Sequence, residues 1–411
     1  MSIYDNAGVA LIPSGTKASK LYSVLPANGD GDFTHSRGST ATRVNKDGFI
    51  ESVATNVPRL DYPLIDGVVQ DCPALLLEPQ RTNNLQRTEE FDNGYWVNNG
   101  VTITSNQIIS PSGTLNADLL SGVSGGFGVV VFSTWSATNK VASCFAKKGS
   151  TNLFKIANVS ASNRYVLFDL SNGTVSEESS GWTGFIENYG NGWYRCTAIS
   201  NNETGTFSLG VTAVSESIYL WGAQLESGSY ATSYIPWDGS GTTTRSADVC
   251  NGSGTSAEFN DSEGVLFAEL EWLETSTNIY LSLSDGTNNN RILIYSSGVS
   301  EIRGLVQDSG STQASFIVDA NAREFSRVAV LYKQNYFAIW INGIELATDS
   351  SGTTPSGLDT LAFNAGATAS FYGKTKQVMT FKTALNDSEL ETLTSWDSFN
   401  AMATGQLYTI E

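Results

Sequence analysis

The chain has 411 residues, of which 40% are hydrophobic and only 16% charged, as in a globular protein with a polar but uncharged surface. At roughly 150 residues per domain, this length predicts about three packing units. The formal net charge of -18 repels nucleic acid and anionic membranes, and no stretch approaches the roughly 20 apolar residues of a bilayer span or forms an export signal, so we expect neither nucleic-acid binding nor membrane insertion.

The N-terminal segment, residues 1–85, is predicted to be irregular. It holds most of the nine prolines, and each proline removes one donor from a β-ladder. Such a segment wraps around or docks onto other parts of a protein and rarely builds a sheet of its own. The single histidine, His35, is expected in a loop, bonded to nearby backbone.

Residues 86–244 contain short runs of strand-forming residues, such as "GVVVFSTW", "RYVLFDL" and "WYRCTAI", separated by Gly, Asn and Ser clusters. That spacing predicts an antiparallel β-sandwich. Trp193 and Trp221 stand inside strand candidates and are expected to fill the sandwich. Trp182 in "SSGWTGF" and Tyr189 in "ENYGNGW" lie in Gly-rich stretches, where we expect loops with exposed rings.

The stretch "SGSYATSYIPWDG" follows the last strand of this sandwich. We interpret it as the exit of the chain, with Tyr230, Tyr234 and Trp237 packed onto a domain or a neighbouring subunit; an aromatic platform for a ligand is the alternative. Residues 245–258 are rich in Ser and Gly and are predicted to be a linker.

A second sandwich is predicted over residues 259–411. In "VLFAELEWL" alternate residues share one face, so Glu269 and Glu271 are expected on a solvated outer face. Asn342-Gly343 suits a type I′ hairpin turn, and "NDSELETLTSW" predicts a short helix with a capping box of Ser388 and Glu391. The fold class is therefore all-β: two antiparallel jelly-roll or β-sandwich domains in tandem, with one short C-terminal helix.

Several motifs carry a family resemblance. "FTHSRGSTATRVNKDGFIESVATNVPRLDYP", "CPALLLEPQRTNNL" and "EEFDNGYWVNN" resemble the opening of a group of bacteriophage virion proteins of the tail-fibre or head-fibre type. "NGWYRCTAI" and "IYLWGAQLESGSYATSYIPWDGSGTTTRSADV" resemble the end of the carbohydrate-binding-module-like jelly roll that follows in that group. The part with "SDGTNNNRI" and "YKQNYFAIWINGIELATD" is similar to concanavalin A-like or laminin-G-like lectin domains.

The resemblance implies a non-enzymatic structural protein on the virion surface, assembled in the host bacterial cytoplasm and anchored through residues 1–85. Its partners would be other virion proteins of the capsid, tail or baseplate, and a host-surface glycan. If the middle sandwich binds that glycan, the rings of Trp182 and Tyr189 in their Gly-rich stretches are the expected contacts. A homotrimer is also implied, although no heptad pattern supports a coiled coil. A decoration protein that binds nothing outside the particle is a further alternative.

Hydrolysis of a surface polysaccharide is the enzymatic alternative. In "AELEWLE", Glu269, Glu271 and Glu274 match the E-x-[DE]-x-x-E spacing of laminarinase-like glycoside hydrolases. Retaining hydrolysis needs two carboxyl groups about 5 Å apart, which residues i and i+2 of one strand provide. The middle residue is Glu where that family has Asp, and its flanking Trp and Met residues are missing.

No cofactor is predicted, and calcium is the one metal left open. Asp285 and Asn288 in "LSDGTNNNR" offer oxygen ligands, and laminin-G-like domains often hold calcium between such loops, but a plain turn is the favoured explanation. Asn28, Asp30 and Asp32 alternate as in a calcium loop, without the glutamate of an EF-hand. The four cysteines form no CxxC pair and are expected to be buried free thiols.

Overall fold

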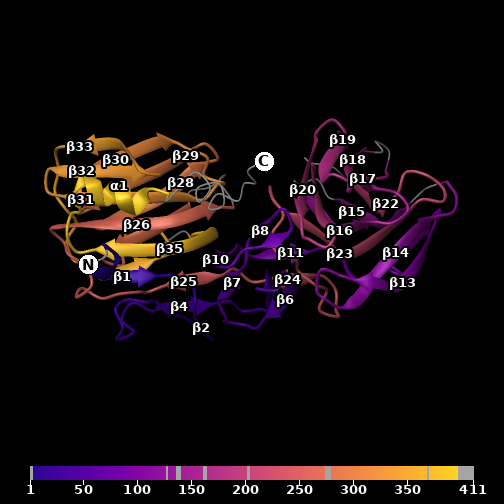
Figure 1. Ribbon diagram of the computed structural model, residues 1–411, viewed down its shortest axis with the longest axis horizontal. Helices are drawn as coiled ribbons and strands as arrows, with labels where there is room; N and C mark the ends of the chain where they lie inside the picture. The colour runs from indigo at the N-terminus through magenta and orange to yellow at the C-terminus, as the bar shows by residue number, and fades with distance from the viewer. Residues whose placement is uncertain are drawn as a thin grey trace.

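The computed structural model describes residues 3–125, 128–135, 140–160, 164–200, 204–273, 279–367 and 370–396. The prediction of an all-β fold is confirmed: antiparallel sheets make up nearly all regular structure, and α1 (Asp387–Thr394) is the one α-helix of these residues. Within them, no helix is long and apolar enough to span a membrane. Two sandwiches lie side by side along the long axis, and the N-terminal segment runs past both (Figure 1).

The middle sandwich, residues 97–227, is made of two six-stranded sheets. The first contains, in spatial order, β12 (Val97–Asn99), β15 (Gly128–Trp135), β22 (Gly205–Gly210), β17 (Leu153–Asn158), β18 (Arg164–Asp169) and β19 (Thr174–Glu178). The second contains β13 (Val101–Ile109), β14 (Leu115–Gly122), β23 (Ser217–Ser227), β16 (Lys140–Lys148), β21 (Trp193–Ser200) and β20 (Trp182–Asn188). Alternate residues of both sheets, such as Phe154, Phe207 and Leu220, form one buried core.

The C-terminal sandwich packs an eight-stranded sheet on a five-stranded one. The larger sheet contains β33 (Ile344–Asp349), β32 (Tyr336–Ile341), β31 (Ser326–Lys333), β26 (Glu263–Trp272), β35 (Gly373–Phe381), β10 (Ala74–Leu77) and β7 (Arg59–Asp61), with β1 (Ala7–Leu11) also paired to β35. The smaller contains β30 (Ser311–Asp319), β29 (Glu301–Asp308), β28 (Arg291–Gly298), β27 (Ile279–Ser284) and β34 (Thr360–Ala362). The helix α1 covers one end of the larger sheet through Leu390 and Leu393.

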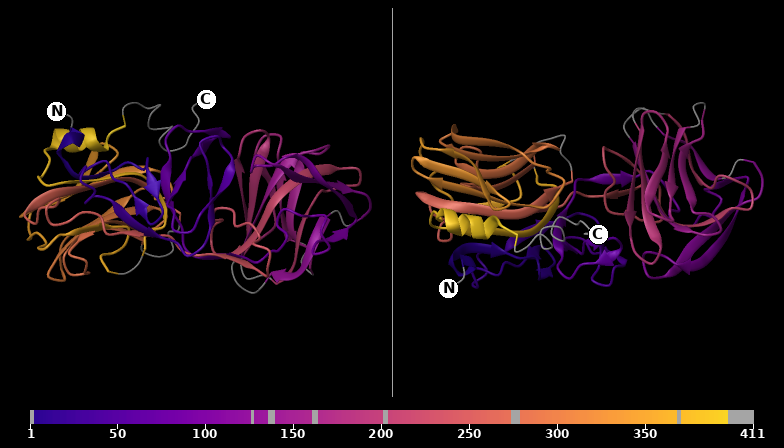
Figure 2. Two further views of the ribbon diagram at one scale, coloured as in Figure 1. Left: turned by 90° about the horizontal axis from the view of Figure 1, so that it is seen from below. Right: turned by 45° about the horizontal axis from the view of Figure 1, so that its top comes forward.

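The prediction that the N-terminal segment is irregular is wrong, because residues 7–83 contain the short strands β1 to β11, and β1, β7 and β10 belong to the larger sheet of the C-terminal sandwich. Strands β1 and β10 occupy successive stretches of the same edge of β35, with Ala7 opposite Phe381 and Leu76 opposite Lys374. The right-hand view of Figure 2 shows this segment along the lower side of the sandwich. The remaining short elements are η1 (Ile3–Asn6), β2 (Thr16–Lys17), β3 (Lys20–Leu21), β4 (Phe33–Ser36), β5 (Ala41–Val44), β6 (Ile50–Val53), β8 (Leu64–Ile65), β9 (Val68–Val69), β11 (Arg81–Asn83), β24 (Thr243–Arg245) and β25 (Val249–Asn251).

Residues 245–258 differ from the predicted linker because a buried ionic group fixes them. Arg59, fully buried, donates to Glu78 at 2.7 Å and to Asp248, and Arg245 lies 2.8 Å from Glu78. Arg37 adds a bond of 3.0 Å to Asp248. We call these five residues the arginine cluster. It joins the N-terminal segment to residues 245–248, and charged side chains are buried only when paired in this way.

His35 also departs from its predicted position. It lies on β4 rather than in a loop, and it is fully buried. Its Nδ1 lies 3.1 Å from the backbone oxygen of Asn56, in keeping with the expected backbone bond, while Nε2 lies 3.3 Å from Asp248. The histidine therefore completes the surroundings of the arginine cluster.

Local signals near the C-terminus are partly confirmed. Asn342 and Gly343 have φ angles of 50° and 86°, as a type I′ turn requires. The capping box, however, is formed by Asn386 and Glu389, two residues before the predicted pair, so the assignment to Ser388 and Glu391 is wrong. Both residue pairs fit the sequence pattern of a capping box. The helix begins after Asn386 because that residue has the extended backbone of an N-cap.

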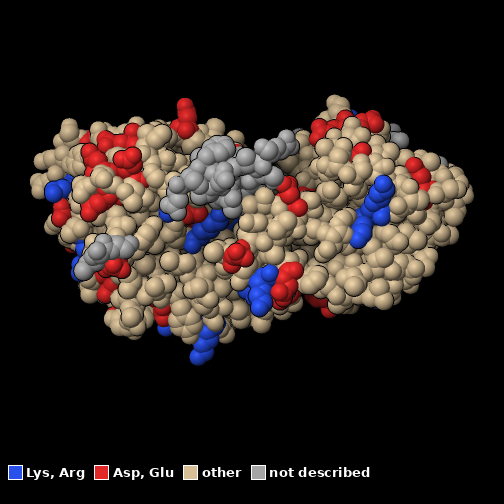
Figure 3. Space-filling model, in the orientation of Figure 1, with Lys and Arg blue, Asp and Glu red and all other residues tan. Residues whose placement is uncertain are grey.

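The surface is largely uncharged, as the composition suggests. Figure 3 shows scattered charged side chains on one face, with acidic groups gathered over the end of the C-terminal sandwich. The acidic residues of that end include Glu345 and Asp349 on β33 and Asp387 and Glu389 on α1.

Candidate functional site

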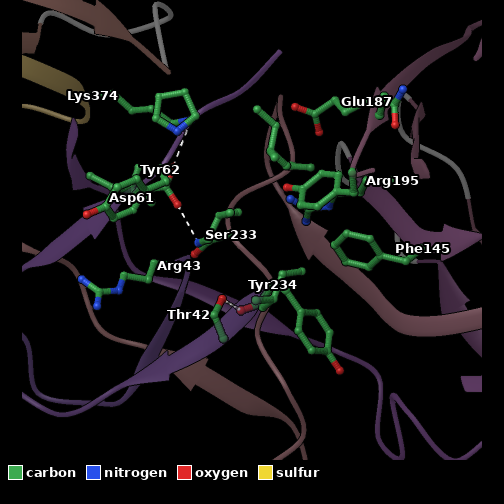
Figure 4. A pocket seen from close by; sticks show the side chains of 18 of the residues that line it. Thr42, Arg43, Asp61, Tyr62, Phe145, Glu187, Arg195, Ser233, Tyr234 and Lys374 are labelled. Carbon is green, nitrogen blue, oxygen red and sulfur yellow. Dashed lines mark hydrogen bonds and ion pairs between the residues drawn. The ribbon is translucent and has the colours of Figure 1, made fainter. Parts of the chain in front are cut away.

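A cavity of about 410 Å³ lies where the N-terminal segment and the two sandwiches meet. Figure 4 shows residues of all three parts around it. Thr42, Arg43, Asp61 and Tyr62 come from the N-terminal segment, Phe145, Glu187, Tyr189, Arg195 and Ser233 from the middle sandwich and its exit, and Leu273 and Lys374 from the C-terminal sandwich. We call it the junction cavity.

An ion pair forms one wall of the junction cavity. Lys374 Nζ lies 3.3 Å from Asp61 Oδ2, and the other carboxylate oxygen of Asp61 accepts the backbone N–H of Val44 at 2.9 Å. Burial opposes the charge of Lys374, but the carboxylates of Asp61 and Glu271 outweigh it and raise its pKa. The lysine therefore stays protonated and offers N–H donors to the cavity.

The opposite wall is aromatic. The Tyr189 ring meets the Phe145 ring edge-on, with centroids 4.9 Å apart, and Arg195 lies 5.5 Å from the centre of Phe145. The backbone N–H of Tyr189 donates to the backbone oxygen of Trp193 at 2.8 Å, which holds the backbone of Tyr189 against the start of β21. Burial, helped by the charge of Glu187, raises the pKa of the Tyr189 hydroxyl to about 12, so it remains a neutral donor.

Two glycines let the N-terminal segment approach the middle sandwich closely. Gly67, in the β8–β9 turn, and Gly190 have φ angles of 78° and 73°. A Cβ on Gly67 would lie 2.6 Å from the nitrogen of Gly190, and a Cβ on Gly190 would lie 2.5 Å from the oxygen of Gly67. Only residues without a side chain allow this approach.

The two predicted glycan-binding aromatics have different outcomes. Tyr189 lines the junction cavity and is half-buried, so it remains a candidate. The prediction of an exposed Trp182 is wrong, because its ring is only 3% exposed and belongs to the core of the middle sandwich. Its Gly-rich surroundings suggested a loop, but Trp182 begins the edge strand β20 and points inward.

The other aromatic residues pack mostly as structural elements. Trp193 and Trp221 are buried, but on the outer face of their sheet, in a cluster with Ile50 and Tyr234 rather than inside the sandwich. Tyr234 lies 4.8 Å from Trp221, Tyr230 is also buried, and Trp237 packs on Arg87 at 4.1 Å. Among the two interpretations of the exit stretch, these contacts agree with packing onto a domain.

The prediction that Glu269 and Glu271 form a solvated face is wrong, since they are 6% and 8% exposed. Glu269 accepts a hydrogen bond from Gln377 at 2.7 Å and lies 3.5 Å from Arg327 and 3.8 Å from Lys376. Burial raises the pKa of Glu271, against the opposing charge of Lys374. Long basic side chains on neighbouring strands cover these carboxylates, which strand alternation alone does not reveal; Glu274 lies outside the described residues.

The residues considered for calcium are engaged in turns. Asp285 accepts the backbone N–H of Thr287 at 2.9 Å and the amide of Asn290 at 2.8 Å, and Asn288 accepts from Arg291 at 2.9 Å. Similarly, Asn28 bonds to Asp30, and Asp32 pairs with Lys20 at 2.7 Å. Within the described part of the chain, no group of three or more His, Cys, Asp or Glu side chains is arranged to hold a metal ion.

Comparison with known proteins yields similarities of structure only. No protein-family model matches the chain, and no curated protein matches it. The CBM40 of the Ruminococcus gnavus IT-sialidase, bound to alpha2,3 sialyllactose, has a TM-score of 0.31 at 16% identity and covers 35% of this chain and 93% of its own. A putative carbohydrate binding protein from Bacteroides ovatus has a TM-score of 0.28 at 12% identity, covering 64% and 78%.

The sialidase of Trypanosoma rangeli in complex with the inhibitor DANA has a TM-score of 0.28 at 11% identity, over 96% of this chain and 84% of that one. All three TM-scores lie below 0.5, so what these proteins bind is not transferred to this chain.

Proposed function

We propose that this chain is a bacteriophage virion surface protein that binds a host-surface glycan in the junction cavity and has no catalytic activity. The observation that carries the proposal is the composition of the cavity wall: the aromatic residue Tyr189 lines the same cavity as the hydrogen-bonding residues Asp61 and Lys374. Sugars need both features, because their C–H faces pack on rings while their hydroxyls pair with polar groups.

The size and charge of the cavity support a small neutral ligand. Its volume of about 410 Å³ falls in the usual range of small-molecule sites. Two of its basic residues form ion pairs, Lys374 with Asp61 and Arg43 with Glu51 at 2.7 Å. The third, Arg195, donates hydrogen bonds to the backbone oxygen of Thr232 at 2.6 Å and to the Ser143 hydroxyl at 3.2 Å. A ligand with many hydroxyl groups can exchange hydrogen bonds with these groups without bringing a charge of its own.

Binding to a glycan array tests the proposal, followed by titration calorimetry with the best retained oligosaccharide. We expect Tyr189→Ala to weaken that binding at least about tenfold, because it removes the aromatic contact. Tyr165→Ala is the matched control, since Tyr165 lies on β18, away from the cavity, and bonds to Glu177 at 2.6 Å. Absence of any retained glycan, or equal affinity of the two variants, would contradict a binding role for the cavity.

Hydrolysis through Glu269 and Glu271 is the weaker candidate. A retaining mechanism requires carboxyl groups that reach the glycosidic bond, whereas Glu269 is held by Gln377, Arg327 and Lys376. Reducing-end release from host capsule or cell-wall glycan, measured with the wild type and with Glu269→Gln, decides between the two. Release that disappears in the variant would replace binding by catalysis.

The virion assignment rests on the motif resemblance of residues 32–97 and of the exit stretch. It includes assembly in the host cytoplasm, attachment to capsid, tail or baseplate proteins, and a homotrimer. Mass photometry of the purified protein tests the trimer, and only monomers would exclude it. Averaged images of the intact virion, labelled with an antibody to this chain, test the location.

A further inference from the structure

A second cavity, of about 490 Å³, shares Tyr189 with the junction cavity. Its walls are mostly apolar and include Phe49, Ile108, Ile109, Leu115 and Trp193. Ile109 and Leu115 are 58% and 62% exposed, so they present apolar surface to solvent. We call it the apolar cavity.

Tyr189 lines both cavities, and the chain passes directly from one to the other at two places. Ile50 lines the junction cavity, and the preceding residue Phe49 lines the apolar cavity. Likewise, Asn188 lines the junction cavity and Asn191 lines the apolar cavity. The two cavities are therefore neighbours that share Tyr189 in their walls, and we refer to them together as the groove.

The groove walls are held by backbone contacts. The N–H of Ile50 donates to the oxygen of Pro111 at 2.8 Å, and the indole N–H of Trp193 donates to the oxygen of Ile109 at 3.0 Å. The first bond joins the N-terminal segment to the turn after β13, and the second joins β21 to β13. Because the wall is already ordered, a ligand that binds there spends little free energy on ordering the protein.

The chemistry of the two halves differs. The junction cavity offers an ion pair and several polar groups, whereas in the apolar cavity Lys147 already donates to the oxygen of Asn191 at 2.6 Å. An apolar wall leaves sugar hydroxyls without partners, but it accommodates methyl groups.

We propose that the glycan is an oligosaccharide of at least two units that spans Tyr189, with a hydroxyl-rich unit in the junction cavity and a methyl-bearing unit in the apolar cavity. The second unit belongs to the class of N-acetyl, O-acetyl or 6-deoxy sugars, whose methyl group packs on Leu115 and Ile109. This inference rests on the proposed glycan-binding function.

The test uses an array of bacterial surface oligosaccharides, each printed in its native form and after mild alkaline de-O-acetylation, with hydroxyl-only and methyl-bearing members. The full-length protein and Leu115→Asp are compared. We expect retained glycans to carry acetyl or deoxy methyl groups, and Leu115→Asp to lose at least about fourfold in affinity for them, the value of one buried methyl group. Ile317→Asp on β30, at a residue 61% exposed, is the control for a charge added at an exposed apolar site.

The possible outcomes distinguish failure of the two-unit ligand from failure of glycan binding itself. Glycan binding that Leu115→Asp leaves unchanged, or that selects sugars without methyl groups, overturns the two-part groove and leaves the junction cavity standing. Absence of binding by the wild type overturns both. A loss in Leu115→Asp that Ile317→Asp does not share, confined to methyl-bearing glycans, supports the proposal.

Discussion

Replacing Glu78 by Gln measures how strongly the arginine cluster holds the N-terminal segment. Burial alone would raise the pKa of Glu78, but Arg245 and Arg59 outweigh it and lower the pKa from 4.5 to about 2. A carboxyl group whose pKa falls on folding stabilises the folded state above its unfolded pKa, and this contribution is lost as the pH falls through its folded pKa. The contribution of Glu78 is therefore complete at pH 7 and disappears between about pH 4.5 and about pH 2.

The magnitude follows from the same two values. A difference of about 2.5 between the pKa values, at about 1.4 kcal/mol for each pKa unit, corresponds to about 3 kcal/mol at pH 7. We expect Glu78→Gln to lower the free energy of unfolding by about that amount at pH 7, and by about half of it at pH 3. Urea unfolding followed by tryptophan fluorescence at both pH values measures the difference.

Glu90→Gln is the matched control, because Glu90 forms an exposed ion pair with Arg87 at 2.8 Å. Exposed pairs contribute about 0 to 1 kcal/mol, so this variant should be nearly as stable as the wild type at either pH. A loss in Glu78→Gln that is the same at pH 7 and pH 3, or one no larger than that of Glu90→Gln, would refute the electrostatic explanation.

Two further predictions concern backbone approach and thiol access. Gly190→Val should separate the β8–β9 turn from the middle sandwich and destabilise the protein by about 2 kcal/mol or more, because the new side chain would collide with Gly67 and the backbone of residue 190 has a positive φ angle. The control Gly94→Ala, where the added methyl group meets open space, should change the midpoint of thermal unfolding little. Equal midpoints for the two variants would contradict the prediction. The four cysteines are free thiols, but the expectation that all are buried is wrong for Cys72, which is exposed. In the folded protein only Cys72 should react rapidly with a thiol reagent, and rapid reaction of a second cysteine would contradict the burial of the other three thiols.

The strands and turns could be predicted because their signals are local. Alternation in "VLFAELEWL" correctly places Leu266, Leu270 and Trp272 on the face that packs against the five-stranded sheet. The Asn342-Gly343 turn follows from the positive φ angles that these two residues tolerate. Each inference needs only a few neighbouring residues.

The site could be predicted only in part because it depends on tertiary contacts. Tyr189 was identified from the sequence, but its partners Asp61 and Lys374 come from distant segments and carry no local motif. The outer face of β26 also follows alternation, yet the sequence gives no sign that Arg327 and Lys376 cover Glu269 there. For Trp182 the error has the opposite direction. Its Gly-rich surroundings predicted an exposed ring, but the residue begins an edge strand and its ring is buried in the core.

The pairing of β1 with β35 has a consequence for biosynthesis. Val9 donates to Thr380 across a sequence separation of 371 residues, so the first strand leaves the ribosome long before its partner is made. At roughly 5 to 20 residues per second, it waits for roughly 20 to 75 seconds. The middle sandwich is contiguous in the chain and can fold within that interval. The N-terminal segment and the C-terminal sandwich share one sheet, so they can complete their folding only together, after translation has nearly ended.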